Sequence, residues 1–197
     1  GVYNVADHPI WLTETGIEVW DDASVDPDPT KYDIAATQEE VAAYTIQSYA
    51  NGWASGIERY FFFRVHDSDM VNSGQHFGLI RNDHTIRPAY VAYQVAASYL
   101  VSPTMVTHST HPSGAWQVTL WGTPRGKLGT LWSTIPTTLT FAYTATLPTA
   151  TLVDQWGVTQ TITATNDVYT LTLPGATANM VSNPEEYIIG GEPTLII

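Results

Sequence analysis

The chain has 197 residues, of which 44% are hydrophobic and 13% are charged, and it contains no cysteine. A chain of this length buries a substantial core without disulfide bonds, which excludes a small disulfide-stabilised scaffold and a cysteine-based metal site. Nineteen acidic residues against seven basic ones give a formal charge of −12. This charge repels phosphate backbones and anionic lipids, so it argues against nucleic acid as a partner and leaves neutral sugars open.

The sequence also argues against a membrane protein, because no apolar run approaches the roughly 18 residues that a membrane span needs. The first residues, Gly1-Val2-Tyr3-Asn4, contain neither an initiator methionine nor a basic segment followed by an apolar one. We therefore expect Gly1 to be a cut end.

The composition changes near Pro103. Residues 1–102 carry 14 acidic and 5 basic side chains, whereas residues 103–197 carry 5 and 2. The second part also contains 22 threonines among its 95 residues. Threonine and valine favour strands, and proline and glycine mark the turns between them. We therefore expect two domains, with α/β structure in residues 1–102 and all-β structure in residues 103–197.

The first domain begins with a strand and a helix. An apolar run at residues 9–13 ends at Glu14-Thr15-Gly16, which predicts a buried strand with a carboxylate at its C-terminal end. Thr37 and Glu40 form a capping box. The apolar residues that follow have helical spacing, and Gly56 can end that helix.

A second strand and a second helix follow. Residues 60–65 form a nearly continuous aromatic run that ends at His66-Asp67, which is typical of a strand covered on both faces. Pro88 suits the first turn of a helix whose apolar stripe reaches Leu100. The alternation of strands and helices predicts parallel strands, but two such units cannot close a sheet. We therefore expect further strands upstream.

The second domain reads as an antiparallel β-sandwich, because short strands recur at regular spacing. Residues 154–157 and 165–167 have turn composition and separate alternating runs, as hairpin loops do. The expected strands are residues 116–121, 127–133, 138–143, 150–154, 159–163, 169–173 and 194–197.

Glu14 is the sharpest candidate for chemistry, because active sites of α/β barrels are built at the C-terminal ends of the strands. Position alone favours a solvated or ion-paired glutamate. The surrounding segment, Pro9-Ile10-Trp11-Leu12-Thr13-Glu14-Thr15-Gly16, however, resembles the seventh-strand segment of clan A glycoside hydrolases, the retaining (β/α)8-barrel glycosidases.

The resemblance extends along nearly the whole chain. Residues 43–53 resemble the seventh helix of that clan, and residues 59–67 resemble the eighth strand. Residues 77–80 and Arg87-Pro88-Ala89-Tyr90 resemble the approach to the eighth helix, and residues 189–193 resemble the closing strand of an appended β-sandwich. The resemblance implies the last two βα units of a (β/α)8 TIM barrel followed by an antiparallel β-sandwich.

The resemblance implies that Glu14 is the catalytic nucleophile of a retaining mechanism, which needs a second carboxyl group about 5–5.5 Å away. In the clan this acid/base is a glutamate after the fourth strand, commonly preceded by asparagine. The sequence contains no Asn-Glu pair. Glu18, Asp21 and Asp22 lie too close to Glu14 along the same loop to reach the other side of a scissile bond, so we expect the acid/base upstream.

His66 and Asp67 would face the same site as substrate contacts. The alternative is structural, with Asp67 capping backbone amides and His66 packing at the rim. Trp20 offers a stacking surface for a sugar, or it anchors the long loop. For the tryptophans of the second domain, packing in the core is a better interpretation than a platform that binds carbohydrate.

The sequence gives no support for a cofactor or a resident metal ion. The acidic loop with Asp21, Asp22, Asp26, Asp28 and Asp33 has oxygen ligands that suit Ca²⁺ but lacks the glycine and closing glutamate of an EF-hand, so a solvated loop is favoured. The histidines have no metal-binding spacing, and no phosphate-binding or nucleophile-elbow motif occurs.

The leading hypothesis is the C-terminal portion of a retaining glycoside hydrolase, with a carbohydrate substrate and with the N-terminal remainder of the barrel, on the same or a separate chain, as its partner. A non-catalytic carbohydrate-binding or structural module is the alternative, and an α/β enzyme of another class with Glu14 as general base is a third possibility. Secretion is the expectation for an enzyme that acts on polysaccharides.

Overall fold

The structure is a computed structural model that describes residues 8–23, 36–67, 76–180 and 182–197. Within these ranges the chain forms two helices and 12 strands, arranged as one six-stranded sheet and three two-stranded sheets. The protein is therefore a mixed α/β protein. None of its described helices is long and apolar enough to cross a membrane.

The first half alternates strands and helices, as predicted. It comprises β1 (Ile10–Thr15), α1 (Gln38–Ala54), β2 (Ile57–Phe62) and α2 (Pro88–Tyr99). β1 and β2 pair in parallel. The second strand starts and ends three residues earlier than the aromatic run suggested, because the charged residues Glu58 and Arg59 extend it at its N-terminal end.

Local sequence signals set the ends of both helices. The hydroxyl of Thr37 accepts the amide of Glu40 at 3.2 Å, while the Glu40 carboxylate accepts the amide of Thr37 at 2.8 Å, so the expected capping box is present. Gly56 follows α1 with φ +70°, a conformation that glycine adopts without strain. Pro88 begins α2, where its missing N–H leaves no helical bond unmade.

The β1–β2 sheet is covered on one face only. Its helix-facing side contributes Phe62 to a core cluster with residues of α1 and α2. On the other side Trp11 is 56% exposed and Phe61 is 47% exposed, and their ring centroids are 6.4 Å apart. The expectation of strands buried on both faces is therefore wrong for this chain, since no described residues pack over Trp11 and Phe61.

The second half, residues 103–197, consists of strands. All seven predicted strands are present, as β4 (Ala115–Thr123), β5 (Gly126–Ser133), β6 (Leu139–Thr144), β7 (Thr149–Val153), β8 (Thr159–Thr163), β9 (Val168–Leu173) and β12 (Thr194–Ile196). Three were not predicted, namely β3 (Met105–Thr110), β10 (Asn179–Met180) and β11 (Asn183–Tyr187). The six-stranded sheet has the order β3-β4-β5-β12-β7-β8, and β6 pairs with β9 in a separate sheet.

Both predicted turns are present, but the hairpin prediction is wrong for residues 165–167, because that turn does not join two paired strands. The Asp154 carboxylate accepts the amides of Trp156 and Val158 at 2.9 Å, and the turn joins the paired strands β7 and β8 as a hairpin. Asn166 and Asp167 have φ values of +51° and +59° in the second turn. That turn carries the chain from β8 to β9, which belong to different sheets.

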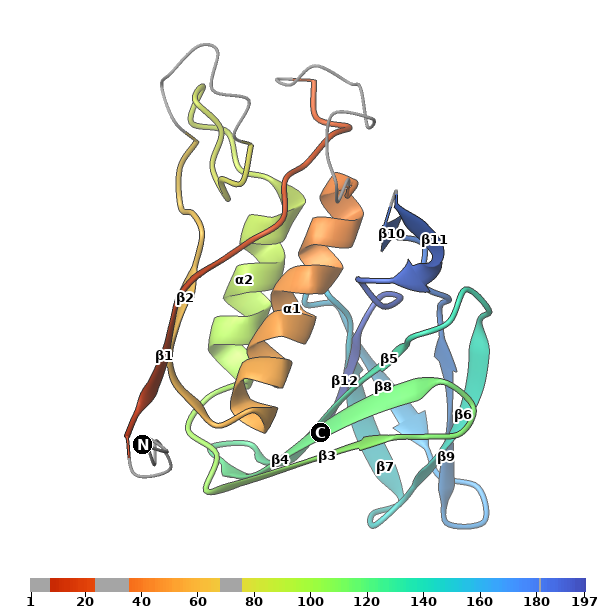
Figure 1. The fold of residues 1–197 in the computed structure, drawn as a ribbon. Coiled ribbons are helices and arrows are strands. Elements are labelled where there is room, and N and C mark those ends of the chain that lie inside the picture. The colour runs from red at the N-terminus through yellow and green to blue at the C-terminus, as the bar shows by residue number, and fades with distance from the viewer. Residues whose placement is uncertain (1–7, 24–35, 68–75, 181) are drawn as a thin grey trace, which may run out of the picture.

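The chain packs in layers (Figure 1). The two helices lie between the β1–β2 sheet and the six-stranded sheet, and the β6–β9 sheet packs on the far side of the latter. One core cluster joins α1 and α2 to β4, β5 and β12. In addition, the Gln47 side chain donates to the carbonyl of Gly191 and accepts the amide of Gly190, at 2.8 and 3.0 Å. The two halves of the chain therefore share an apolar interface.

Candidate active site

Glu14 is the penultimate residue of β1, and its side chain is exposed. Neighbouring Thr15 is tied to the helix layer, because its hydroxyl bonds to the hydroxyl of Tyr44 on α1. The Glu14 carboxylate itself makes no hydrogen bond or ion pair with the residues that the structure describes. It is thus an open carboxylate at the C-terminal end of a parallel strand, where barrel enzymes place reactive groups.

The end of β1 lies directly against the residues that follow β2. The amide of Phe63 donates to the carbonyl of Thr15 at 2.7 Å. A Cβ atom on Gly16 would lie 2.0 Å from the carbonyl oxygen of Phe63, so only glycine permits this approach. Glu14 and the loop after β2 therefore lie at the same end of the sheet, where the loops after both strands gather (Figure 1).

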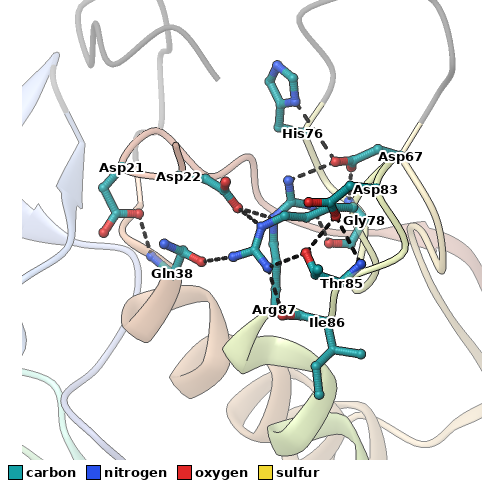
Figure 2. Close-up of polar contacts among 11 residues, drawn as sticks. Asp21, Asp22, Gln38, Asp67, His76, Gly78, Asp83, Thr85, Ile86 and Arg87 are labelled. Carbon is teal, nitrogen blue, oxygen red and sulfur yellow. Dashed lines mark hydrogen bonds and ion pairs between the residues drawn. The ribbon is translucent and has the colours of Figure 1, made fainter. Parts of the chain in front are cut away.

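A buried arginine joins these loops (Figure 2). Arg87, 1% exposed, donates from Nε to Asp22 Oδ2 at 2.6 Å and from Nη2 to Asp67 Oδ2 at 2.7 Å. Its Nη1 donates to the carbonyl of Gly78 at 2.6 Å. Burial alone would lower the pKa of Arg87, but the two carboxylates raise it above its usual value, so the guanidinium stays charged. Arg87 therefore ties the loop after β1 to the loop after β2.

A second arginine extends this ion network toward α1. Arg81 donates to Asp22 Oδ2 at 2.7 Å and to the side-chain oxygen of Gln38 at 2.6 Å. Asp21 accepts the amide of Gln38 at 2.8 Å. The first turn of α1 is thus fixed to the loop after β1. Asp21 and Asp22, considered above as oxygen ligands for Ca²⁺, both have protein donors.

The side chains predicted to contact a substrate differ in their exposure and in their existing hydrogen bonds. Asp67 is 6% exposed, and its Oδ1 accepts the amide of Gly78 at 2.8 Å while Oδ2 accepts Arg87. This carboxylate caps a backbone amide and pairs with an arginine, which is the structural alternative left open above. Trp20 is half-buried in the loop after β1 and has no ring contact with the described aromatic residues.

His66 lies at the same end of the sheet. Its Nδ1 is 2.8 Å from the carbonyl oxygen of Asp67, and its ring centroid is 5.4 Å from that of His84. Its buried Nε2 has no hydrogen-bond partner among the described residues. The tautomer with a proton on Nδ1 satisfies the carbonyl and leaves Nε2 as a free acceptor.

Two titratable groups near the ion network have shifted pKa values. Burial raises the pKa of the Glu18 carboxyl, although the backbone amide of His76 opposes the shift. Burial also lowers the pKa of His76, against the attraction of Asp67, whose Oδ2 lies 4.0 Å from His76 Nδ1. Both shifts stabilise the neutral form relative to the charged form, compared with an exposed side chain of the same type.

The Asp22–Arg87–Asp67 arrangement was missed from the sequence. In the sequence, Arg87 stands out only as part of the Arg-Pro-Ala-Tyr segment, and Asp22 stands out only as one of several acidic residues in a loop. The one usable signal was the parallel-strand rule, which places the loops after both strands at one edge. The described residues contain no group of three or more histidine and acidic side chains that could hold a metal ion.

Comparisons with known proteins show a likeness of fold to solved structures. No family model and no curated protein matches the sequence. Among solved structures, a family 39 glycoside hydrolase from the gut symbiont Bacteroides cellulosilyticus WH2 matches 96% of this chain and 33% of its own, with a TM-score of 0.65 and 21% identity.

Two further structures match with lower scores. A GH30 endoxylanase from Clostridium papyrosolvens C71 has a TM-score of 0.56 and 10% identity, over 97% of this chain and 42% of its own. The catalytic domain of GH30 xylanase C from Talaromyces cellulolyticus has a TM-score of 0.55 and 13% identity, over 96% and 40%. The chain thus shares its fold with part of these glycoside hydrolases and spans between a third and about two fifths of their length.

Proposed function

We propose that this chain is the C-terminal portion of a retaining glycoside hydrolase, with Glu14 as its nucleophile. The observation that carries the proposal is the open carboxylate of Glu14 at the end of β1, held against the end of β2 by Gly16. The fold likeness to parts of glycoside hydrolases supports it. In this proposal residues 1–102 are the last two βα units of a TIM barrel, and residues 103–197 are an accessory β-sandwich.

The reaction would proceed by double displacement. A Glu14 oxygen attacks the anomeric carbon, the glycosidic C–O bond breaks, and the leaving oxygen takes a proton from the second carboxyl group. A water molecule then returns its proton to that group and attacks the same carbon, which releases Glu14 as a carboxylate. The second carboxyl group would come from an upstream segment, since no described acidic side chain faces Glu14 from another strand.

The proposed partner is the remainder of the barrel, on the same or a separate chain. Trp11, Phe61 and Val65 are 56%, 47% and 62% exposed on or beside the uncovered face of the β1–β2 sheet. In a closed barrel this face is interior and is packed by side chains of the other strands. Residues 1–197 alone should therefore self-associate and should not hydrolyse aryl glycosides at a normal rate.

Within this site His66 and Trp20 are the proposed substrate contacts. The Nε2 of His66 is buried and has no partner among the described residues, so accepting a sugar hydroxyl requires the ring to turn toward the open end of the sheet. The half-buried ring of Trp20 offers an apolar face for a sugar ring. Asp67 would not contact the substrate and would instead fix the position of the loop after β2.

The test is mechanism-based labelling of the protein with its barrel completed. A 2-deoxy-2-fluoro glycoside should form a stable ester on Glu14, located by peptide mass spectrometry. Glu14→Gln should lower turnover by several orders of magnitude without changing the circular dichroism spectrum, because the amide fills the same volume but cannot form the ester.

Near-normal turnover of Glu14→Gln would end the nucleophile assignment. Binding of oligosaccharides without labelling or turnover would favour the non-catalytic module. Turnover that depends on Glu14 without a trapped ester would favour its use as a general base.

A further inference from the structure

The second half of the chain carries a cavity that the proposed active site does not use. It has a volume of about 420 Å³ and opens between the six-stranded sheet and the β6–β9 sheet. Its walls are mainly apolar and include Tyr143, Leu147, Ala150, Tyr169 and Ile196. This volume lies within the range of about 300–1,000 Å³ that is usual for small-molecule sites.

The cavity contains a lysine at a position where the strand pattern calls for an apolar residue. Lys127, Gly129 and Leu131 alternate along β5, and Leu131 belongs to the core between the two sheets. Lys127 therefore faces the space between the sheets. An inward-pointing charge is a common protection of edge strands, but β5 is a central strand. That explanation does not apply here.

Aromatic rings hold the ammonium group of Lys127 in place. Its Nζ lies 4.9 Å from the ring centre of Trp121 and 5.2 Å from that of Tyr143. No carboxylate among the described residues pairs with it. The contacts with the rings stabilise a cation without neutralising it, so the positive charge remains available to a ligand at the wall of an apolar cavity.

The basic residues of the second half of the chain lie at this cavity. Residues 103–197 contain five acidic residues and two basic ones, Arg125 and Lys127, and both basic residues line this cavity. The guanidinium of Arg125 stacks on Tyr99 of α2, 4.3 Å from the ring centre, on the other face of the six-stranded sheet, so Lys127 is the cation that the cavity presents to a ligand. In a chain with a formal charge of −12, this is an unusual site of attraction for anions.

We propose that this cavity binds a small carboxylate with an apolar, ring-sized body, whose carboxylate pairs with Lys127 and whose body fills the space between Tyr143, Leu147 and Ile196. A neutral sugar fits less well, because sugars stack on exposed aromatic faces, whereas the rings of Tyr143 and Tyr169 are only 8% and 3% exposed. The site is independent of Glu14 and of the proposed hydrolysis.

The experiment uses benzoate and cinnamate as probes, with residues 1–197 as part of a protein whose barrel is completed. Ligand-observed NMR and calorimetry should show saturable binding of at least one acid, and its methyl ester should bind about tenfold or more weakly, because the charge-assisted contact is lost. Lys127→Met should weaken binding of the acid to the same extent, and Lys127→Arg should retain most of it.

Controls separate this site from other outcomes. Arg59→Met removes an exposed cation elsewhere and should leave binding unchanged, and chemical shifts of Leu147 and Ile196 should move on titration. No saturable binding of either acid, equal binding by Lys127→Met, or preference for a neutral oligosaccharide would overturn the proposal. Circular dichroism of Lys127→Met, in which methionine replaces the lysine stem, confirms that the variant is folded.

Discussion

Replacing Arg87 by methionine tests whether the buried arginine holds the two loops of the candidate site together. The side chains of Asp22 and Asp67 are 2% and 3% exposed, so water cannot replace the lost donor well. Methionine keeps much of the aliphatic stem and removes the hydrogen bonds of 2.6 to 2.7 Å to Asp22, Gly78 and Asp67. The substitution therefore removes the charge with little change in packing volume.

The loss of Arg87 should affect the carboxylate of Asp67 more than that of Asp22. Asp22 keeps Arg81 at 2.7 Å, whereas Asp67 keeps, among the described residues, the amide of Gly78 at 2.8 Å and a histidine nitrogen 4.0 Å away. Breaking a buried ion pair by removing one partner costs about 3–5 kcal/mol. Domains are stable by about 5–15 kcal/mol, so Arg87→Met should remove a large share of the free energy of unfolding.

Urea unfolding followed by circular dichroism measures this loss. The matched control is Arg59→Met, since Arg59 and Glu58 are 3.8 Å apart with side chains 58% and 51% exposed, and such pairs contribute about 0–1 kcal/mol. Adding Asp67→Asn to Arg87→Met should recover part of the loss, because the unpaired buried charge is then gone. A free energy of unfolding for Arg87→Met within about 1 kcal/mol of the wild type would refute the reasoning.

Three further predictions concern the loop after β1. In the completed enzyme, Glu14→Gly should be nearly inactive and should regain part of its turnover with external azide, which a hydrolysis assay measures. Gly16→Ala should lower the free energy of unfolding by about 1–3 kcal/mol in urea, since its Cβ would lie 2.0 Å from the Phe63 oxygen; an unchanged midpoint would contradict this. Burial raises the pKa of Glu18, so its charged form destabilises the fold above that pKa. Glu18→Gln should therefore raise the melting temperature at pH 7, and the gain should shrink as the pH falls through the raised pKa.

Hydrophobic periodicity predicts those strands whose alternation reports a buried face, whereas β8, which has no buried residue, was predicted from its β-prone composition and the turns beside it. β6 and β9 alternate between buried and exposed residues along most of their length, and both were predicted. β3 was missed because five of its six residues are exposed and the remaining one, Val106, is half-buried. β10 and β11 are short and lack buried residues, so hydrophobic periodicity carries no signal for them.

Part of the candidate site is built from neighbouring residues in the sequence, and part is built from contacts between residues that are far apart in it. Glu14 and Gly16 follow an apolar run within one segment, so a strand-end carboxylate is visible in eight consecutive letters. Arg87, by contrast, reaches Asp22 across 65 positions and Asp67 across 20, and no periodicity encodes such a contact. Because this ion network joins the loops after both strands, the chain itself fixes the loops beside Glu14 and His66. The sheet face of Trp11 and Phe61 stays exposed among the described residues, and in the proposed mechanism a segment packed on that face would bring the second carboxyl group to Glu14.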